Sequence, residues 1–358
     1  MISDRKQEHL ELAVTDNAQG RGSPGWEDVH LIPATFPETN LDRVDTQGEL
    51  AGRALRAPFV ISSMTGGHKA AVEINRRLAT VADELGIAVG SGSQRAALRD
   101  PSLVPTFRVL REAAPDATII ANIGVCQLVE QGDETALDRD DVRTIVEMLD
   151  AQFLAVHLNV VEELIQPEGD RKMVGLLDAL AAVVEWSPVP VIAKETGAGI
   201  AREAASTLVG LGISAIDVGG AGGTSFARVE GMRAANRGEA RGTLLGETFG
   251  EWGIPTAVAI LEARDTDIPI IATGGMRTGL DAAKALALGA TAVGIGKPAL
   301  VAASSGMGAL RTEMELLIEE LRVAMVLTGS SDLRQLRQPT PVLTGRVGDW
   351  GRQRRLIP

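Results

Sequence analysis

The sequence predicts an α/β protein whose main body is a (β/α)8 barrel of the TIM type, preceded by an N-terminal extension and followed by a C-terminal helix and tail. Between residues 57 and 328, short apolar runs alternate eight times with alanine- and leucine-rich stretches of helical period, as expected for a parallel sheet with covering helices. Eight units over about 250 residues favour a closed barrel over the rival doubly wound sheet. Glycine or polar residues follow each of the eight apolar runs.

The composition limits the function classes. The 358 residues suffice for one large domain or two small ones, and a 45% share of hydrophobic residues provides a sizeable core. The formal net charge of −12 leaves no excess of cations to neutralise nucleic-acid phosphates, so no nucleic-acid partner is expected. The single cysteine, Cys126, excludes an intrachain disulfide and is typical of a reducing cytosol. We find neither a signal peptide nor a long apolar run, and we expect a cytoplasmic protein without a membrane span.

Residues 1–56 form the extension, which is mixed in composition and rich in turn residues. A short helix within residues 1–14 would bring Arg5 and His9 onto one face, because they are four residues apart. Taken alone, this pattern is more typical of a solvated basic patch. The alternative is that the extension packs on the barrel and contributes substrate contacts.

The eight predicted strands are short runs of apolar and β-branched residues. They cover residues 58–63, 87–90, 118–122, 153–159, 190–194, 215–219, 269–273 and 292–296. The helices predicted between them cover residues 70–85, 141–149, 173–184, 201–211, 256–263 and 280–288. A long C-terminal helix is predicted over 306–327. Residues 329–358 form the tail, whose arginine-rich part, residues 338–358, is expected to be irregular.

Polar residues gather where these strands end. In a barrel all eight carboxyl ends lie at one face, where active sites are built. His157 and Asn159 alternate with Leu158 and can therefore point to one face. Glu162 and Glu163 follow in what reads as an acidic loop. Imidazole, amide and carboxylate groups thus converge at the end of one strand, although a plain polar loop is the commoner meaning of such a run.

Glycine clusters at the last three strand ends predict a phosphate site. They are Gly222-Gly223-Thr224, Gly274-Gly275, and Gly294 with Gly296. Backbone N–H groups and a helix N-terminus at these ends can hold a phosphate, so a phosphate-bearing cofactor is expected. The alternative is that the glycines only form tight turns.

Lys194 ends a buried strand and has several possible functions. It could form a Schiff base, act as a base or stabilise an anionic ligand. The structural alternative is an ion pair with Asp217 or a glutamate. Beside a phosphate-bearing cofactor, the base and the electrostatic function are the simpler interpretations.

A second anion site is predicted from cationic and hydrogen-bonding residues. An anionic group of the substrate could be bound by Ser93, Gln94 and Arg95 together with Arg5 and Lys6. Arginine is suited to bidentate phosphate contacts. Glu163 could then carry Mg²⁺, which typically binds one or two carboxylates plus substrate phosphates. His157, His9 and His68 are the acid–base candidates. Cys126 has no evident histidine partner and is expected to be a small buried residue.

Together, the motifs resemble a known family. They are Arg5-Lys6-x-Glu8-His9-Leu10, Ser62-Ser63-Met64-Thr65-Gly66-Gly67, Gly92-Ser93-Gln94-Arg95, Ala121-Asn122-Ile123-Gly124, His157-Leu158-Asn159, Gln166-Pro167-Glu168-Gly169-Asp170, Lys194-Glu195-x-Gly197, Gly220-x-Gly222-Gly223-Thr224-Ser225, Trp252-Gly253-Ile254-Pro255-Thr256 and Gly274-Gly275-x-Arg277. Over nearly its whole length the chain is similar to the type 2 isopentenyl diphosphate isomerases, which are FMN-dependent (β/α)8 enzymes. A 2-hydroxy-acid oxidase, another flavin barrel, is disfavoured because no Arg–His pair follows the late strands.

The resemblance implies a set of cofactor and substrate contacts. FMN would contact Met64, Thr65, Gly66, Ser93, Asn122, Lys194 and Thr224, and its phosphate would lie on Gly274, Gly275, Met276, Arg277, Ala299 and Leu300. The substrate would contact Arg5, Lys6, His9, Ser93, Gln94, Arg95, His157, Asn159 and Glu162. Glu163 would bind Mg²⁺.

The resemblance also implies the reaction, which interconverts isopentenyl and dimethylallyl diphosphate by moving a double bond. There is no net redox change, yet the family needs reduced FMN, supplied by NADPH or another reductant. The flavin is thought to act as an acid–base catalyst, and Lys194 would favour its anionic reduced form. Glu162 and His157 are the further catalytic candidates. Members are commonly tetramers or octamers, so a homo-oligomer is expected.

One residue departs from the family pattern His-x-Asn-x-x-Gln-Glu, because Glu162 stands where the glutamine belongs. A neutral Glu162 could replace the amide and even transfer a proton. An ionised Glu162 offers no donor, and could bind a second metal or weaken diphosphate binding. The chain could therefore be a working isomerase, a paralogue acting on another prenyl diphosphate, or a protein that binds FMN or prenyl diphosphate without turnover.

Overall fold

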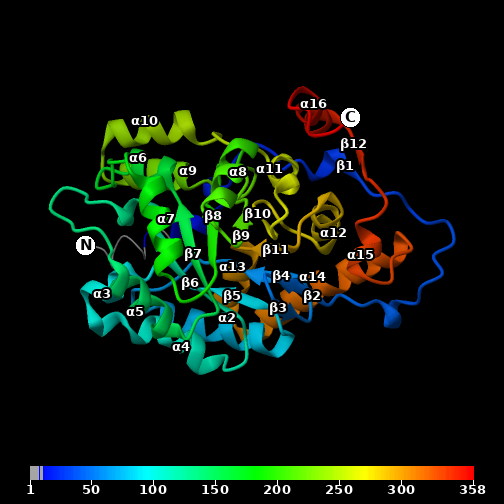
Figure 1. Ribbon diagram of the computed structural model, residues 1–358, viewed down its shortest axis with the longest axis horizontal. Coiled ribbons are helices and arrows are strands. Elements are labelled where there is room, and N and C mark those ends of the chain that lie inside the picture. Colours follow the sequence, from blue (N-terminus) through cyan, green and yellow to red (C-terminus); the bar gives the residue numbers. More distant parts are fainter. Residues whose placement is uncertain (1–7, 9–10) are drawn as a thin grey trace.

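Eight parallel strands form a closed barrel at the centre of the protein (Figure 1). The computed structural model describes Glu8 and residues 11–358. The strands run around the barrel in the order β10-β11-β4-β5-β6-β7-β8-β9, and β9 pairs with β10 to close it. They are β4 (Phe59–Ile61), β5 (Ala88–Gly90), β6 (Ile119–Gly124), β7 (Phe153–Leu158), β8 (Val191–Glu195), β9 (Ala215–Asp217), β10 (Ile270–Thr273) and β11 (Ala292–Ile295). All eight predicted strands are present, so the predicted barrel is confirmed and the open sheet is excluded.

Helices surround the barrel. The principal ones are α2 (Ala71–Leu85), α4 (Pro105–Ala113), α5 (Arg139–Leu149), α7 (Leu176–Trp186), α8 (Arg202–Gly210), α11 (Thr256–Ala263), α12 (Gly279–Leu288) and α13 (Lys297–Ser305). The six predicted helices each correspond to one of these, with shifted ends. The predicted long C-terminal helix is α14 (Met307–Leu327). Helices α4 and α13 have no counterpart among the predicted helices.

The sequence analysis also missed the paired helices α9 (Phe226–Asn236) and α10 (Ala240–Phe249). Glycine brings them close together, because a Cβ at Gly231 would lie only 2.9 Å from the Cα of Gly246. The face that α9 buries is partly ionic: Glu230 is 0% and Arg233 2% exposed. A pattern search that looks for apolar residues on the buried face cannot find such a helix.

The N-terminal end of the barrel is closed by part of the extension. Strands β2 (Gly48–Leu50) and β3 (Arg53–Leu55) form an antiparallel hairpin. Its Leu50 and Leu55 belong to the same buried cluster as side chains from the barrel strands, including Ile120 and Phe153. Because the hairpin seals this end, the cavity described below opens at the carboxyl ends of the strands.

The C-terminal tail is not irregular, which corrects the prediction for residues 338–358. Strand β12 (Val342–Leu343) pairs antiparallel with β1 (Val29–His30), and α16 (Gly345–Gln353) follows it (Figure 1). The buried carboxylate of Glu262 accepts hydrogen bonds from Trp350 Nε1 at 3.1 Å and Arg354 Nε at 2.9 Å. The tail is therefore anchored by a tertiary ion pair, which local sequence does not reveal.

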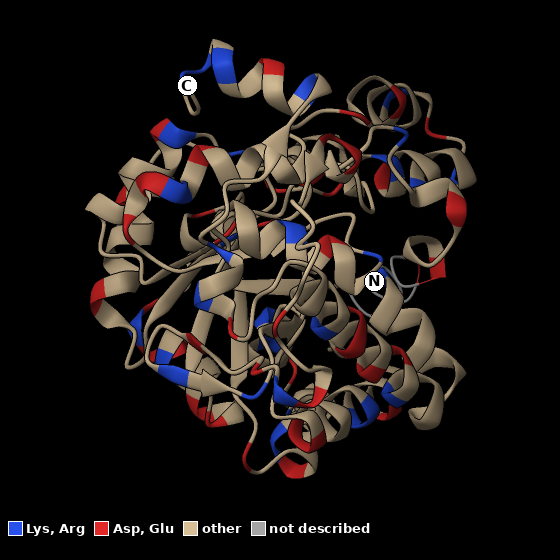
Figure 2. Cartoon of the chain, turned by 90° about the vertical axis from the view of Figure 1, so that its right-hand side faces the viewer, with Lys and Arg blue, Asp and Glu red and all other residues tan. Residues whose placement is uncertain are grey.

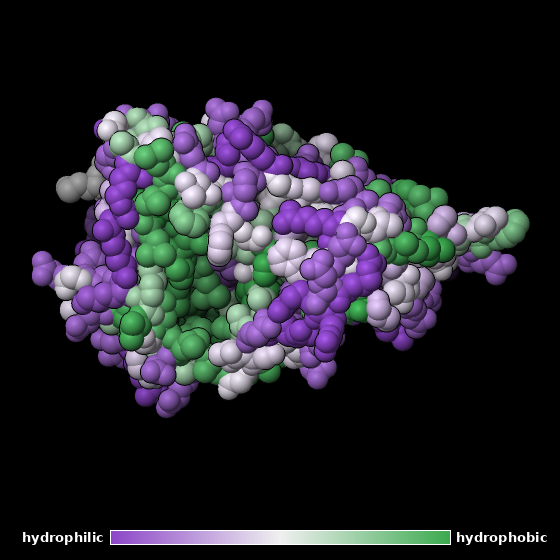
Figure 3. Space-filling model, turned by 90° about the horizontal axis from the view of Figure 1, so that it is seen from above, coloured by the Kyte–Doolittle hydropathy of each residue, from purple (hydrophilic) through white to green (hydrophobic). Residues whose placement is uncertain are grey.

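The outer surface mixes charges of both signs. Figure 2 shows Lys and Arg interspersed with Asp and Glu on the outer helices of the side that it displays. From above, Figure 3 shows a hydrophobic strip on the side that carries α10. Leu244 and Phe249 of α10 are exposed, as is Trp252 shortly after it. Within the described part of the chain, no helix combines the length and the hydropathy that crossing a membrane requires.

Candidate active site

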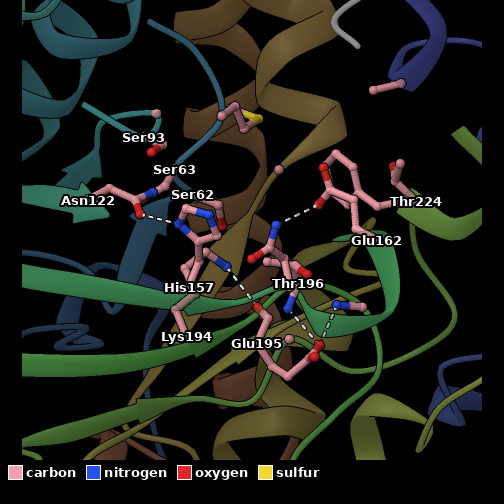
Figure 4. A pocket seen from close by; sticks show the side chains of 18 of the residues that line it. Ser62, Ser63, Ser93, Asn122, His157, Glu162, Lys194, Glu195, Thr196 and Thr224 are labelled. Carbon is pink, nitrogen blue, oxygen red and sulfur yellow. Dashed lines mark hydrogen bonds between the residues drawn. The ribbon is translucent and has the colours of Figure 1, made fainter. Parts of the chain in front are cut away.

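A cavity of about 840 Å³ opens at the carboxyl face of the barrel, and residues from all eight strand ends line it. Figure 4 shows its interior, with His157 and Lys194 projecting from neighbouring strands. Strands β7 and β8 pair in register, with His157 opposite Lys194. Residues that are far apart in the sequence therefore meet here because parallel strands all end at one rim.

Most of the predicted site residues line this cavity. They are Met64, Thr65, Gly66, Ser93, Arg95, Asn122, His157, Asn159, Glu162, Glu163, Lys194, Thr224, Gly274, Gly275, Met276, Arg277 and Leu300. His68, an acid–base candidate, also lines it. The predicted contacts of Arg5, Lys6 and His9 lie outside the described residues.

Gln94 and Ala299 do not line the cavity, so the structure does not bring them together with the other predicted site residues. Gln94 is fully buried, and its Nε2 donates to the backbone carbonyl of Ile145 at 2.9 Å. Its Oε1 accepts from the backbone N–H of Asn122 at 3.0 Å. Gln94 thus joins the end of β5 to β6 instead of facing a ligand. Ala299 is buried in the first turn of α13.

A hydrogen-bond relay orients His157. Its Nδ1 lies 2.7 Å from Asn122 Oδ1, and Asn122 Nδ2 donates to the Ser91 carbonyl at 3.0 Å (Figure 4). Since the Asn122 oxygen can only accept, Nδ1 of His157 carries the proton. Gly124 leaves room for the ring, because a Cβ there would lie 2.8 Å from His157 Nε2.

Lys194 forms the ion pair that was one of its predicted alternatives, and it also lines the cavity. Its Nζ lies 3.0 Å from Asp217 Oδ2 and donates to the Glu195 carbonyl at 3.2 Å. Both side chains are largely buried. Because the Lys194 nitrogen is held by the Asp217 carboxylate and a backbone carbonyl, the geometry favours an electrostatic function over a Schiff base.

Glu195 is a cavity residue that the sequence analysis did not select. Its Oε2 accepts backbone hydrogen bonds from Thr196 at 2.6 Å, Gly197 at 2.7 Å and Ala198 at 2.6 Å (Figure 4). Burial raises the pKa of Glu195 to about 7, although these N–H groups and the Lys194 charge lower it. The sequence feature that could have identified Glu195 as a cavity residue is a carboxylate directly after Lys194, at a strand end that contains glycine.

Glu162 and Glu163 lie on a short helix, α6 (Val160–Ile165), and not in the predicted acidic loop. Glu163 is 9% exposed. Its Oε1 accepts from Asn159 Nδ2 at 2.9 Å and its Oε2 from the Asp170 N–H at 2.8 Å. Glu162 Oε2 lies 3.4 Å from the same Asn159 nitrogen. Asn159 therefore lies between the two adjacent carboxylates, closer to that of Glu163.

A cationic group lies at the rim. Arg95, at the start of α3 (Arg95–Arg99), forms ion pairs with Glu134 and, at 3.5 Å, with Asp170. Arg99 contacts the same Glu134 at 2.5 Å. All four residues line the cavity. The sequence analysis did not select Arg99 or Glu134, because nothing in their local pattern marks them as rim residues.

Arg233 of α9 connects the rim to the N-terminal extension. Its guanidinium lies 2.5 Å from Glu230 Oε2, 2.7 Å from Glu168 Oε1 and 3.0 Å from Glu8 Oε2. Burial raises the pKa of Glu168, but the hydrogen bond and charge of Arg233 outweigh this and hold it below its usual value. Arg233 therefore ties Glu8 to the loop after β7, in which Glu168 lines the cavity.

The opposite side of the cavity presents backbone donors. Five backbone N–H groups there donate to no acceptor among the described residues, and all five residues line the cavity. They belong to Gly223, Thr224, Gly274, Gly275 and Met276. The glycines are required by close packing, since Gly275 has a φ of +68° and a Cβ there would lie 2.7 Å from the Gly222 carbonyl. Tight turns and a phosphate site are thus compatible, because the turns place at the cavity donors that have no acceptor among the described residues.

These features fit a phosphate-bearing planar cofactor. The buried hydroxyls of Ser62 and Thr273 have no hydrogen-bond partner among the described residues, and both residues line the cavity. No cluster of three or more potential metal ligands exists in the described part of the chain. Glu163 alone fits an ion that takes its other ligands from water and a phosphorylated substrate, as Mg²⁺ does. Cys126 is buried, as predicted, and burial raises the pKa of its thiol to about 12.

Comparisons with known proteins give a consistent result. The family of FMN-dependent dehydrogenases matches residues 162–341. The isopentenyl-diphosphate delta-isomerase of Methanothermobacter thermautotrophicus is 45% identical over 99% of this chain and 97% of its own. That of Methanosarcina acetivorans is 44% identical over 96% of this chain and 92% of its own. A mandelate oxidase variant solved with 2-hydroxy-phenylacetamide has a TM-score of 0.62 and 19% identity, covering 96% of this chain and 98% of its own. At that identity the likeness concerns the fold alone.

Proposed function

The chain belongs to the type 2, FMN-dependent isopentenyl-diphosphate isomerase family, and from this premise we propose that it interconverts isopentenyl and dimethylallyl diphosphate, using reduced FMN and Mg²⁺. One observation carries the proposal: a single cavity brings backbone donors that have no acceptor among the described residues together with Arg95, His157 and Glu163 on the other side. Such a cavity can hold two anionic groups, one from a cofactor and one from a substrate.

The cofactor occupies the part of the cavity nearest the glycine-rich loops in this proposal. Its phosphate is bound by Arg277 and by the N–H groups of residues 223–224 and 274–276, which have no acceptor in the described part of the chain. Bound reduced FMN supplies an acid–base group at the reacting carbons of the substrate. Lys194 lies at the same face, and its ammonium favours negative charge on the ring.

The substrate diphosphate occupies the cationic side. Arg95 can exchange its ion pairs with Glu134 and Asp170 for the diphosphate, since charge-assisted arginine–phosphate contacts are strong. Asn122 holds Nδ1 of His157 and so fixes the ring, which lines the cavity. The predicted contacts of Ser93 and Asn159 belong to the same proposal, as do those of Arg5, Lys6 and His9.

Magnesium is held in this proposal by Glu163 and the diphosphate. The Glu163 carboxylate is oriented by hydrogen bonds from Asn159 and the Asp170 N–H, and it lines the cavity. A single carboxylate is enough for Mg²⁺ when phosphate and water complete the octahedron. NADPH or another reductant would supply the electrons that keep the flavin reduced.

Glu162 is the residue that decides between the working isomerase and the alternative, a family paralogue that uses another prenyl diphosphate or binds without turnover. It lines the cavity beside Asn159. A protonated Glu162 donates a hydrogen bond and can transfer a proton to a substrate carbon. An ionised Glu162 adds a negative charge where a diphosphate must bind, which weakens that binding.

An anaerobic assay in D₂O tests the proposal. Purified protein, FMN, Mg²⁺, a flavin reductant and isopentenyl diphosphate should give deuterated dimethylallyl diphosphate, and omission of the reductant should abolish it. The Glu162→Gln variant is the matched comparison, because it changes charge and donors but not shape. Bound FMN with no product from the native chain, together with product from Glu162→Gln, would support the paralogue instead.

A further inference from the structure

A segment of the extension, residues 15–25, lies across the outer side of the glycine-rich loops, and we call it the strap. Gln19 forms an antiparallel bridge with Thr224. The Gly20 N–H donates to the Gly223 carbonyl at 2.9 Å, and the Ser225 N–H donates to the Ala18 carbonyl at 2.9 Å. The strap therefore pairs like a short strand with the loop that carries the unpaired donors.

The side chain of Gln19 joins two parts of the proposed phosphate site. Its Nε2 donates to the Gly222 carbonyl at 2.9 Å, and its Oε1 accepts from Arg277 Nη2 at 2.6 Å. Both ends of the amide are used, so its orientation is fixed. Because Gly222 follows β9 and Arg277 follows β10, Gln19 sets the spacing between two loops from neighbouring strands.

Arg277 is held through its guanidinium group, by Gln19 at one nitrogen and by a backbone carbonyl at the other. Its Nη1 donates to the carbonyl of Met276 at 2.9 Å, and its backbone N–H donates to Asp281 Oδ2 at 3.1 Å. Arg277 lines the cavity, whereas Gln19 does not. Any influence of Gln19 on a ligand in the cavity must therefore act through Arg277 and the loop at Gly222.

The strap is also held by contacts that do not involve the Gln19 side chain. The backbone N–H groups of Arg21 and Gly22 donate to the Glu251 carboxylate at 2.8 and 2.6 Å. The Ala257 N–H donates to the Pro24 carbonyl at 2.9 Å. Loss of the Gln19 amide should consequently leave the strap in place and change only the alignment of Arg277 and the Gly222 loop.

We propose that Gln19 is a positioning residue for the cofactor phosphate: it aligns Arg277 with the N–H groups of Gly223 and Thr224, and so determines the preference for a flavin that carries a phosphate over one that does not. This inference rests on the proposed function, because it takes the FMN phosphate as the anion bound there. It assigns a function to a polar residue of the extension outside the cavity.

The test compares FMN with riboflavin, which has the same ring but no phosphate. Flavin-free full-length protein is titrated with each flavin, and flavin fluorescence gives the two dissociation constants. The native chain should prefer FMN. Gln19→Ala should weaken FMN binding by about tenfold, as expected for loss of a hydrogen bond to a charged group, and leave riboflavin binding unchanged. Gln19→Glu should weaken FMN binding at least as much, because a carboxylate lacks the donor to Gly222 and competes with the phosphate for Arg277.

Asn17→Ala is the matched control. Asn17 is an exposed amide two residues away, and its side chain forms no hydrogen bond to the described residues; its loss should affect neither flavin. Equal weakening of both flavins by Gln19→Ala would mean a general structural effect and overturn the inference. If Gln19→Ala bound FMN as tightly as the native chain does, the inference would also be overturned. Failure of the native chain to bind FMN would overturn the proposed function and this inference together, a result distinguishable from the other two.

Discussion

The Nζ of Lys194 lies 3.0 Å from Asp217 Oδ2, and the two side chains are 10% and 6% exposed. They therefore form a buried ion pair at the carboxyl ends of β8 and β9. A buried pair of this kind contributes little net stability, but removal of one partner is costly because it leaves the other charge unpaired.

We expect Asp217→Asn to lower the free energy of unfolding by about 3 kcal/mol or more, measured by urea denaturation. The double variant Lys194→Met with Asp217→Leu should recover most of that loss, since no charge is left unpaired. It should nevertheless lack isomerase activity, because no cation remains beside the flavin site. An active double variant would show that Lys194 is only structural.

Glu163→Gln should raise the Mg²⁺ concentration needed for half-maximal activity by at least about tenfold, because the amide replaces the one carboxylate proposed for the metal. The neighbouring Glu162→Gln serves as the control and should shift this concentration less. FMN binding should be unchanged in both variants. A larger metal effect at Glu162 would assign the ion to that residue instead.

Glu195 should make stability depend on pH. Burial raises its pKa to about 7 from an ordinary value of 4.5, so the folded state binds a proton more tightly than the unfolded state does. The resulting stabilisation is complete below pH 4.5 and is lost as pH rises through about 7. In Glu195→Gln, the urea midpoint should change less between pH 4.5 and 7.5 than in the native chain. An identical pH profile would contradict the raised pKa.

Arg233→Met should destabilise the protein by about 3 kcal/mol or more, because it removes the buried ion pair that Arg233 forms with the fully buried Glu230. Arg237→Met is the control. Arg237 pairs with Glu8 and Glu168 as well, but it is 39% exposed, so its loss should cost less than about 1 kcal/mol. Thermal and urea unfolding of the two variants provide the comparison, and equal losses would show that burial of Arg233 is unimportant.

The barrel was predictable from sequence because each strand is a local run with a clear end. Strand β8, for example, is apolar until Lys194, and its end is marked by charge and glycine. The cavity was predictable for the same reason, since parallel strands place all their ends at one rim. The function of each residue that lines it remains a proposal.

The features that sequence did not reveal depend on contacts between distant segments. Gln94 resembles a site residue by its neighbours Ser93 and Arg95, yet its side chain is used inside the protein by Ile145 and Asn122. Helices α9 and α16 are secured by Arg233 and Glu262, whose partners lie elsewhere in the chain. A buried ionic face has no apolar period, so local patterns predict surface or coil at such places.

The pairing of β1 with β12 bears on how the chain folds. Val29 pairs with Leu343 and His30 with Val342. The ladder therefore joins two segments that are more than 300 residues apart in the sequence. During synthesis, this ladder cannot form until residues 342 and 343 have left the ribosome, and contacts of such long sequence separation form slowly. Docking of β12 on β1 is then expected to follow assembly of the barrel, whose eight strands all precede β12 in the sequence. A Val342→Pro change should slow this docking step by weakening the ladder without altering the barrel.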